Sequence, residues 1–119
     1  MSIRVHVSVI HPELNRSVGR QWTLTLKEGS SIIDVIKAVD GEISRVTPIF
    51  PIKGYRSLLQ MTFHPREERF YRQVAIQAYE RPGVLLPVRQ EPNMPLPNEV
   101  IVIVVPEGPC ITEWEDVVA

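Results

Sequence analysis

Late in the chain the sequence reads Val100-Ile101-Val102-Ile103-Val104-Val105, an apolar run that does not alternate with polar residues. A β-strand of this composition is typical of a central position in a sheet, where both of its faces are covered. The run is far shorter than the roughly 20 residues that a membrane-spanning helix needs. We therefore expect residues 100–105 to form a central strand, and we expect no membrane span.

Two further strands are predicted near the start of the chain. Residues 2–10 and 20–26 alternate apolar and polar side chains, as half-buried strands do. The side chains expected to point inward are Ile3, Val5, Val7, Val9, Trp22, Leu24 and Leu26. Because only the polar stretch 11–19 separates the two segments, we expect it to be a turn that joins them as an antiparallel hairpin.

A short amphipathic helix is predicted to follow this hairpin. Ser31 is suited to cap its N-terminus, and the carboxylate of Asp34 favours the positive end of the helix dipole. The apolar stripe of this helix consists of Ile32, Val35, Ile36 and Val39. Gly41 is suited to end the helix in the left-handed conformation, so we expect the helix to span residues 31–40.

The middle of the chain is expected to add β-structure. Residues 58–63 and 73–79 read as strands on either side of a charged bend at 64–69. Residues 84–88 can return from the second of these strands as a hairpin. Proline cannot donate to a sheet ladder, so Pro87 would confine that last strand to an edge.

The segments 3–9, 26–36 and 97–106 carry a family resemblance. A hairpin, a crossing helix and a late central strand resemble the ubiquitin-like β-grasp fold. Within it, the chain is most similar to the small subunits of molybdopterin synthase and the sulfur carriers of thiamine synthesis. The resemblance implies an α+β fold with a mixed sheet, one main helix, and first and last strands that are adjacent and parallel. We predict a single β-grasp domain over residues 1–119, with an inserted β-hairpin region at 42–97 and a C-terminal extension at 106–119.

In those carriers the chain ends in a flexible Gly-Gly whose carboxylate is adenylated and then thiolated or conjugated. The present sequence departs from this pattern, because it reads Glu107-Gly108-Pro109-Cys110 and continues to Ala119. A free carboxylate at Gly108 would require removal of the residues that follow it. Activation as a sulfur carrier or modifier at a processed Gly108 is therefore an alternative function for this chain.

No arrangement of residues in the sequence demands a reaction. Cys110 has no histidine close by in sequence, and a lone cysteine is most often a small packed hydrophobic residue. His6, His11 and His64 lack metal-ligand spacing, and the scattered glycines form no phosphate-binding loop. We therefore expect a protein that is not an enzyme and that uses no cofactor or metal.

Charge is unevenly distributed, although the net charge is only −1. Residues 45–90 hold eight basic and three acidic side chains, whereas residues 91–119 hold six acidic and no basic ones. Either the acidic end folds back onto the basic middle, or each meets a different partner. The basic middle with its aromatics also suggests an RNA-associated module, as an alternative. A pI of about 6.3 is not typical of a dedicated nucleic-acid binder, so we do not expect nucleic acid as the partner.

The leading hypothesis is a non-catalytic adaptor module that docks on a protein partner. The docking patch would be the outward row of the last strand, formed either by Val100, Val102 and Val104 or by Ile101, Ile103 and Val105. The candidate partner-binding residues are Trp114, Ile101, Ile103, Val105, Arg66, Arg69 and Arg72. Trp22 is a further candidate anchor, because tryptophan is enriched at interface hot spots.

Two further expectations concern the ends of the chain. The acidic-aromatic stretch 111–116 could support self-association, by binding the basic middle of a second copy. The first residues already follow the strand pattern and contain no apolar signal region. We therefore expect a cytoplasmic protein.

Overall fold

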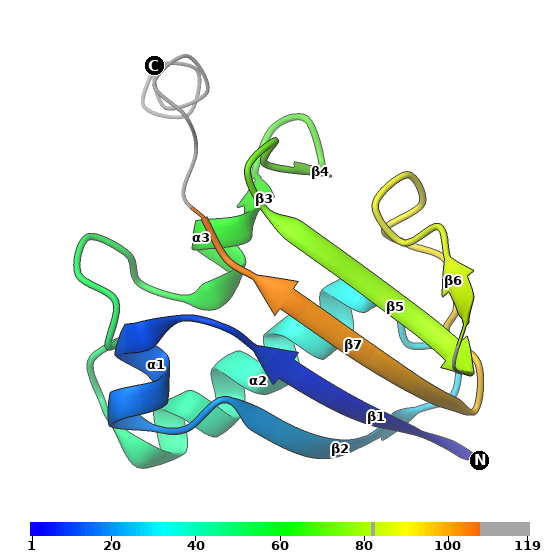
Figure 1. Ribbon diagram of the computed structural model, residues 1–119, viewed down its shortest axis with the longest axis horizontal. Helices are drawn as coiled ribbons and strands as arrows, with labels where there is room; N and C mark the ends of the chain where they lie inside the picture. The colour runs from blue at the N-terminus through cyan, green and yellow to red at the C-terminus, as the bar shows by residue number, and fades with distance from the viewer. Residues whose placement is uncertain (82, 108–119) are drawn as a thin grey trace.

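The computed structural model describes residues 1–81 and 83–107, which are shown in Figure 1. Five strands form a mixed sheet in the order β2-β1-β7-β5-β6. These strands are β1 (Ser2–Val9), β2 (Gln21–Lys27), β5 (Ala75–Arg81), β6 (Val84–Leu86) and β7 (Glu99–Val105). The other elements are α1 (Pro12–Ser17), α2 (Ile32–Val46), α3 (Leu58–Thr62), β3 (Phe63–His64) and β4 (Arg69–Phe70). The described chain therefore has an α+β fold.

The first and last strands of the sheet lie side by side and parallel, as predicted. β1 and β7 pair in parallel with Val5 opposite Val100 and Val7 opposite Val102. β1 also pairs antiparallel with β2, which confirms the predicted hairpin. On its other side β7 pairs antiparallel with β5, so the apolar run forms the middle strand of the sheet.

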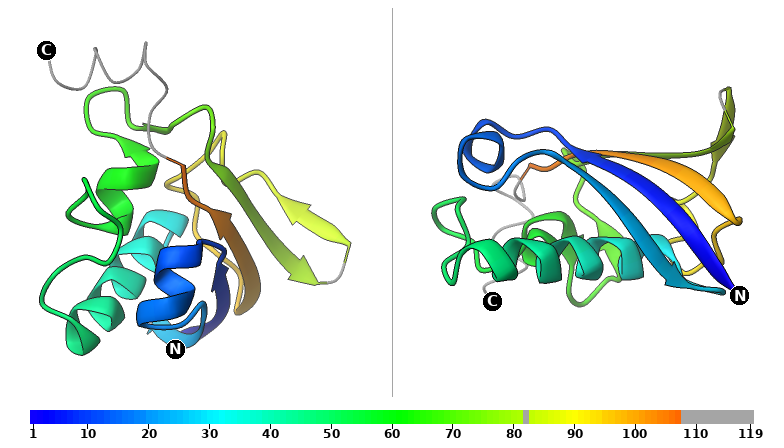
Figure 2. Two further views of the ribbon diagram at one scale, coloured as in Figure 1. Left: turned by 60° about the vertical axis from the view of Figure 1, so that its left-hand side comes forward. Right: turned by 90° about the horizontal axis from the view of Figure 1, so that it is seen from below.

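Helix α2 covers one face of this sheet, as Figure 2 shows from below. The helix buries an apolar stripe made of Ile32, Val35, Ile36, Val39 and Ile43. From β7 the side chains of Val100, Val102 and Val104 are 0 % exposed and belong to the same core. The opposite row of β7 faces outward, and its Ile101 is 39 % exposed. Within residues 1–81 and 83–107 no segment covers this outward row completely, so the cover expected for the second face of the strand does not come from the described part of the chain.

The start of α2 is as predicted, but its end is not. The carboxylate of Asp34 accepts hydrogen bonds from the backbone N–H and the hydroxyl of Ser31, at 2.9 and 3.3 Å. Gly41 does not adopt the predicted left-handed conformation, and the helix continues to Val46. Glycine inside a helix costs about 1 kcal/mol. Burial of the Ile43 side chain contributes about 1.5–3 kcal/mol, which outweighs that cost.

The polar stretch 11–19 contains helix α1 and is not only a turn. Nδ1 of His11 accepts a hydrogen bond from the backbone N–H of Glu13 at 3.2 Å and so caps the helix. Pro12 occupies the first turn, where its missing N–H has no cost. Leu14 is fully buried, so this short helix closes one end of the core.

Residues 58–62 form helix α3, so the prediction of a strand at 58–63 is wrong. The hydroxyl of Ser57 accepts from the backbone N–H of Gln60 at 3.0 Å, which caps the helix. Asp40 of α2 accepts from the backbone N–H groups of Leu58 and Leu59 at 2.6 and 3.0 Å. The cap residue of α3 and one carboxylate of α2 therefore satisfy the N–H groups that a helix start leaves without partners.

The predicted hairpin of residues 73–79 and 84–88 is present as β5 and β6, whereas the short hairpin of β3 and β4 was not predicted. The charged bend joins β3 to β4, with Phe63 opposite Phe70. β5 and β6 pair antiparallel, and β6 lies at an edge of the sheet with Pro87 immediately after it. The predicted insertion therefore supplies two strands of the main sheet and a separate two-stranded hairpin.

Candidate functional site

The sheet face opposite α2 is open among the described residues (Figure 2). One row of directly opposed residues crosses all five strands on this face, namely Thr23, His6, Ile101, Tyr79 and Leu85. Opposed residues of antiparallel strands have Cβ atoms about 4.5–5.5 Å apart, so Ile101, Tyr79 and Leu85 form a continuous apolar strip. Leu85 is 59 % exposed, which makes this strip accessible to another molecule.

The exposure of the β7 side chains shows which of the two rows predicted as a docking patch faces outward. Ile101, Ile103 and Val105 belong to the outward row, whereas the alternate valines lie in the core. Tyr79 and Leu85, which complete the apolar strip, were not among the predicted binding residues. Their alternation could have indicated an outward face, but only the pairing of β5 with β7 and β6 places them beside Ile101.

A polar group borders the apolar strip on the β1 side. Nε2 of His6 lies 3.2 Å from Oε1 of Glu99, and its Nδ1 lies 3.5 Å from the Thr23 hydroxyl oxygen. Hydroxyl, imidazole and carboxylate are the groups of hydrolase triads. Here the distance between the hydroxyl oxygen and the imidazole is at the outer limit of a hydrogen bond. All three side chains also face solvent, which weakens the electrostatic interactions among them. We therefore interpret these residues as a polar border of the apolar strip, in which His6 is held between Thr23 and Glu99.

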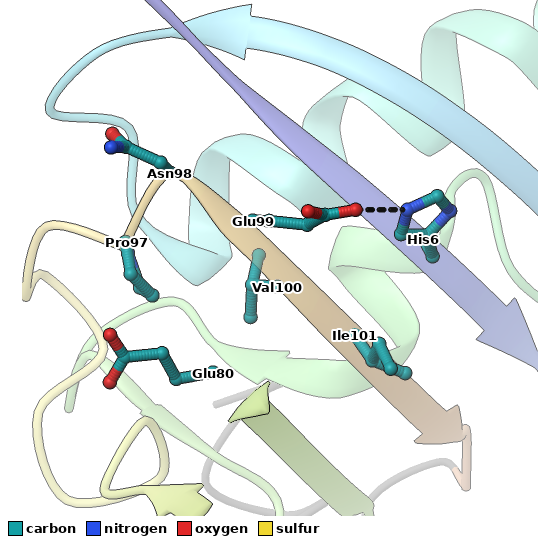
Figure 3. Close-up of a pocket in the computed structure, with 7 residues that line it drawn as sticks. All are labelled: His6, Glu80, Pro97, Asn98, Glu99, Val100 and Ile101. Carbon is teal, nitrogen blue, oxygen red and sulfur yellow. Dashed lines mark hydrogen bonds and ion pairs between the residues drawn. The ribbon is translucent and has the colours of Figure 1, made fainter. Parts of the chain in front are cut away.

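A shallow hollow of about 680 Å³ opens beside this border, where β7 begins (Figure 3). It is lined by His6, Glu80, Pro97, Asn98, Glu99, Val100 and Ile101. In Figure 3 the Glu99 carboxylate points toward His6, whereas the Glu80 carboxylate lies near Pro97. Two carboxylates at one end of an apolar strip favour a basic group on a docking molecule.

The predicted basic residues are only partly brought together. Arg69 and Arg72 line a second hollow of about 440 Å³, and Arg89 lines it with them. Arg66 does not line this hollow and lies in the turn between β3 and β4. Arg89 was not a predicted site residue, because only the return of the chain after β6 brings it to this place.

Interactions within this second hollow reduce its positive charge. Nε of Arg69 donates to Oε2 of Glu67 at 2.8 Å, and this hydrogen bond holds the pKa of the Glu67 carboxyl below its usual value of 4.5. The Arg89 guanidinium donates to the backbone carbonyls of Tyr71 and Val74, so it also holds the chain in place. The arrangement is that of a basic surface with structural ion pairs.

The aromatic residues beside the arginines face inward. Phe70 and Tyr71 are 2 % and 1 % exposed, so neither offers a face on which a base could stack. His64 is 1 % exposed, and its Nδ1 accepts from the backbone N–H groups of Arg66 and Glu67, both at 3.1 Å. This histidine therefore shapes the turn between β3 and β4.

Several predictions fall on residues that the structure does not describe. Gly108, Cys110, Trp114 and the stretch 111–116 lie beyond residue 107. Within residues 1–81 and 83–107 there is no group of three or more His, Cys, Asp or Glu that could hold a metal ion. Among the described helices, none has the length and apolar character needed to cross a membrane.

Comparison with models of known protein families gives no match, and comparison with curated proteins gives none. The family resemblance therefore depends on the order of the elements and on the parallel pairing of β1 with β7. Because unrelated activities share one fold, an argument about function has to come from the surface of this chain.

Proposed function

We propose that this chain is a non-catalytic, ubiquitin-like β-grasp module that docks on a protein partner through the open face of its sheet. The β1–β2 hairpin, the single long helix across one face and the parallel neighbours β1 and β7 support the β-grasp assignment. The observation that carries the docking function is the exposed apolar strip of Ile101, Tyr79 and Leu85.

Covering this strip would supply part of the free energy of a weak complex, and the rest has to come from contacts around it. Complete burial of a leucine or isoleucine side chain contributes about 1.5–3 kcal/mol. Ile101 is 39 % exposed and Leu85 is 59 % exposed, which together equal about one fully exposed side chain. Covering both would therefore contribute about 1.5–3 kcal/mol. Tyr79 adds an aromatic ring with a polar end, a type of side chain enriched at interfaces.

The border of the strip indicates the chemistry of the partner. Glu80 and Glu99 line the hollow next to Ile101, so negative charge lies at one end of the apolar surface. A partner segment that places an aliphatic or aromatic side chain beside a lysine or arginine would match both features. We infer that such a segment is what the open face binds.

Selection from a displayed library of random peptides tests this proposal with the full chain as bait. We expect enriched peptides to combine an apolar residue with a nearby lysine or arginine. Ile101→Glu and Leu85→Glu should each weaken binding of the selected peptides at least about tenfold, because a carboxylate replaces the apolar contact.

Ile49→Glu is the matched control, since Ile49 is 77 % exposed and lies in the connection after α2 rather than on the sheet. This variant should bind the selected peptides like the unmodified chain. Circular dichroism and thermal unfolding verify that all three variants are folded. Failure to enrich any peptide, or equal binding by all three variants, would contradict docking on the open face.

A further inference from the structure

The outer edge of β2 exposes a row of backbone hydrogen-bonding groups. The backbone N–H of Val9 donates to the carbonyl of Arg20 at 2.8 Å, whereas that of Arg4 donates to Asn98, beside β7. The backbone groups of odd-numbered residues of β1 therefore form hydrogen bonds with β2. The β2 residues opposite them are even-numbered, so the even-numbered residues of β2 use their backbone groups to bind β1. In a β-strand successive residues direct these groups to opposite sides. The N–H and C=O groups at positions 21, 23 and 25 consequently point away from the sheet.

Apart from Lys27 at its end, this edge lacks the features that usually prevent strands from pairing. β2 has seven residues, contains no proline and pairs with β1 in continuous register without a bulge. By contrast, β6 at the other edge has three residues and is followed by Pro87. A long, regular edge with outward backbone groups is a template for another strand.

We propose that two copies of this chain associate by antiparallel pairing of their β2 strands, about a two-fold axis at Leu24. In this register Thr23 lies opposite Thr25 of the second copy, so the outward backbone groups form hydrogen-bonded pairs. Trp22 lies opposite Leu26 of the second copy on the side that faces α2. Both of these side chains are only half-buried in one chain, so pairing would bury more of their apolar surface.

Charge complementarity identifies a second copy as the occupant of this edge. The same register places Arg20 opposite Glu28 of the second copy, and the two-fold axis repeats this pair of opposite charges. Both residues are exposed and flank β2 directly. A centre at Thr23 would place Arg20 opposite Leu26, and a centre at Thr25 would place Trp22 opposite Glu28. Only the register centred on Leu24 matches both the charged and the apolar residues.

Analytical ultracentrifugation of the full chain tests this inference independently of the docking proposal. One strand pair makes a small interface, so we expect a dimer with a dissociation constant of about 10 µM to 1 mM. Arg20→Glu and Glu28→Arg should each weaken the dimer at least about tenfold. In either variant, residues 20 and 28 carry like charges at both of their contacts across the two-fold axis. An equimolar mixture of these two variants should dimerise again, since every pair then has opposite charges.

Thr25→Pro provides a test that does not depend on charge. The proline lacks the outward N–H that would pair with the second copy, so we expect a monomer. Residue 25 makes no backbone hydrogen bond to β1, and proline is tolerated at sheet edges, so we expect the variant to fold. Lys37→Glu, an exposed charge reversal on α2, should leave the dimer unchanged. The inference is overturned if the unmodified chain is monomeric at about 1 mM, the weak limit expected for a small interface. It is also overturned by a dimer that survives Arg20→Glu and Thr25→Pro, including a dimer formed through residues 111–116.

Discussion

Substitution of Asp40 tests how α3 is attached to the rest of the molecule. The carboxylate of Asp40 accepts from the backbone N–H groups of Leu58 and Leu59, across 18 and 19 positions of sequence. These groups lie in the first turn of α3, where the helix itself supplies no acceptor. Asp40→Ala therefore removes both acceptors at a partly buried position and leaves two donors without partners.

The expected loss of stability follows from two opposing terms. A hydrogen bond to a charged group contributes about 1.5–3 kcal/mol, so two such bonds set an upper limit of about 3–6 kcal/mol. Burial raises the pKa of the Asp40 carboxyl above its usual 3.8, despite the hydrogen bonds from Leu58 and Leu59 that lower it. The ionised group therefore carries a desolvation cost that offsets part of this gain. We expect Asp40→Ala to lower the free energy of unfolding by about 1–3 kcal/mol.

Urea unfolding followed by circular dichroism measures this change. With a slope of about 1–3 kcal/mol per molar urea, the expected loss is a clear shift of the midpoint. Glu42→Ala is the control on the same helix. Among the described residues Glu42 pairs with Arg45 at the surface, so its loss should change stability by less than about 0.5 kcal/mol. Equal midpoints for Asp40→Ala and Glu42→Ala would refute the reasoning.

The raised pKa of Asp40 also predicts the pH dependence of its contribution. Between pH 3.8 and the higher pKa of the folded state, the folded chain binds the proton more tightly than the unfolded chain does. Asp40 thus contributes most to stability below pH 3.8, and this contribution decreases as the pH rises through the folded-state pKa. The stability difference between the unmodified chain and Asp40→Asn should therefore be larger at low pH than at neutral pH. Unfolding titrations at a series of pH values would contradict this sign if the difference instead grew toward neutral pH.

Three further substitutions test the fold. Ser31→Ala should lower the free energy of unfolding by about 0.5–1.5 kcal/mol, measured in urea, because it removes the hydroxyl that donates to the Asp34 carboxylate at the start of α2. Gly29→Ala should lower the melting temperature through a loss of about 1 kcal/mol, since Gly29 has a φ of 91°; an unchanged melting temperature would argue against this backbone conformation. Val102→Ala should cost about 2–3 kcal/mol in urea, because Val102 is fully buried, whereas Ile101→Ala should cost clearly less.

Local patterns in the sequence were sufficient to predict the principal strands and the start of the main helix. Alternation along β1 and β2 depends only on which neighbours are apolar, and the spacing of Ser31 and Asp34 depends on one helical turn. The parallel contact of β1 with β7 was predicted only through resemblance to a known arrangement of elements. The structure confirms that contact.

Where local and tertiary preferences conflicted, the tertiary structure decided. Gly41 favours a helix end, but burial of Ile43 continues α2 beyond it. Residues 58–62 are helical because Ser57 and Asp40 supply the acceptors for the first turn of α3. A pattern read along the chain does not contain an acceptor that lies 18 positions away.

The candidate surface shows the same division. The sequence determined that residues 100–105 form an apolar strand, but its two rows are chemically almost identical. Only the packing of α2 decided that Val102 is buried and Ile101 is outward, and only strand pairing placed Tyr79 and Leu85 beside Ile101. Strand formation depends on residues adjacent in sequence, whereas exposure depends on which distant segments cover each face.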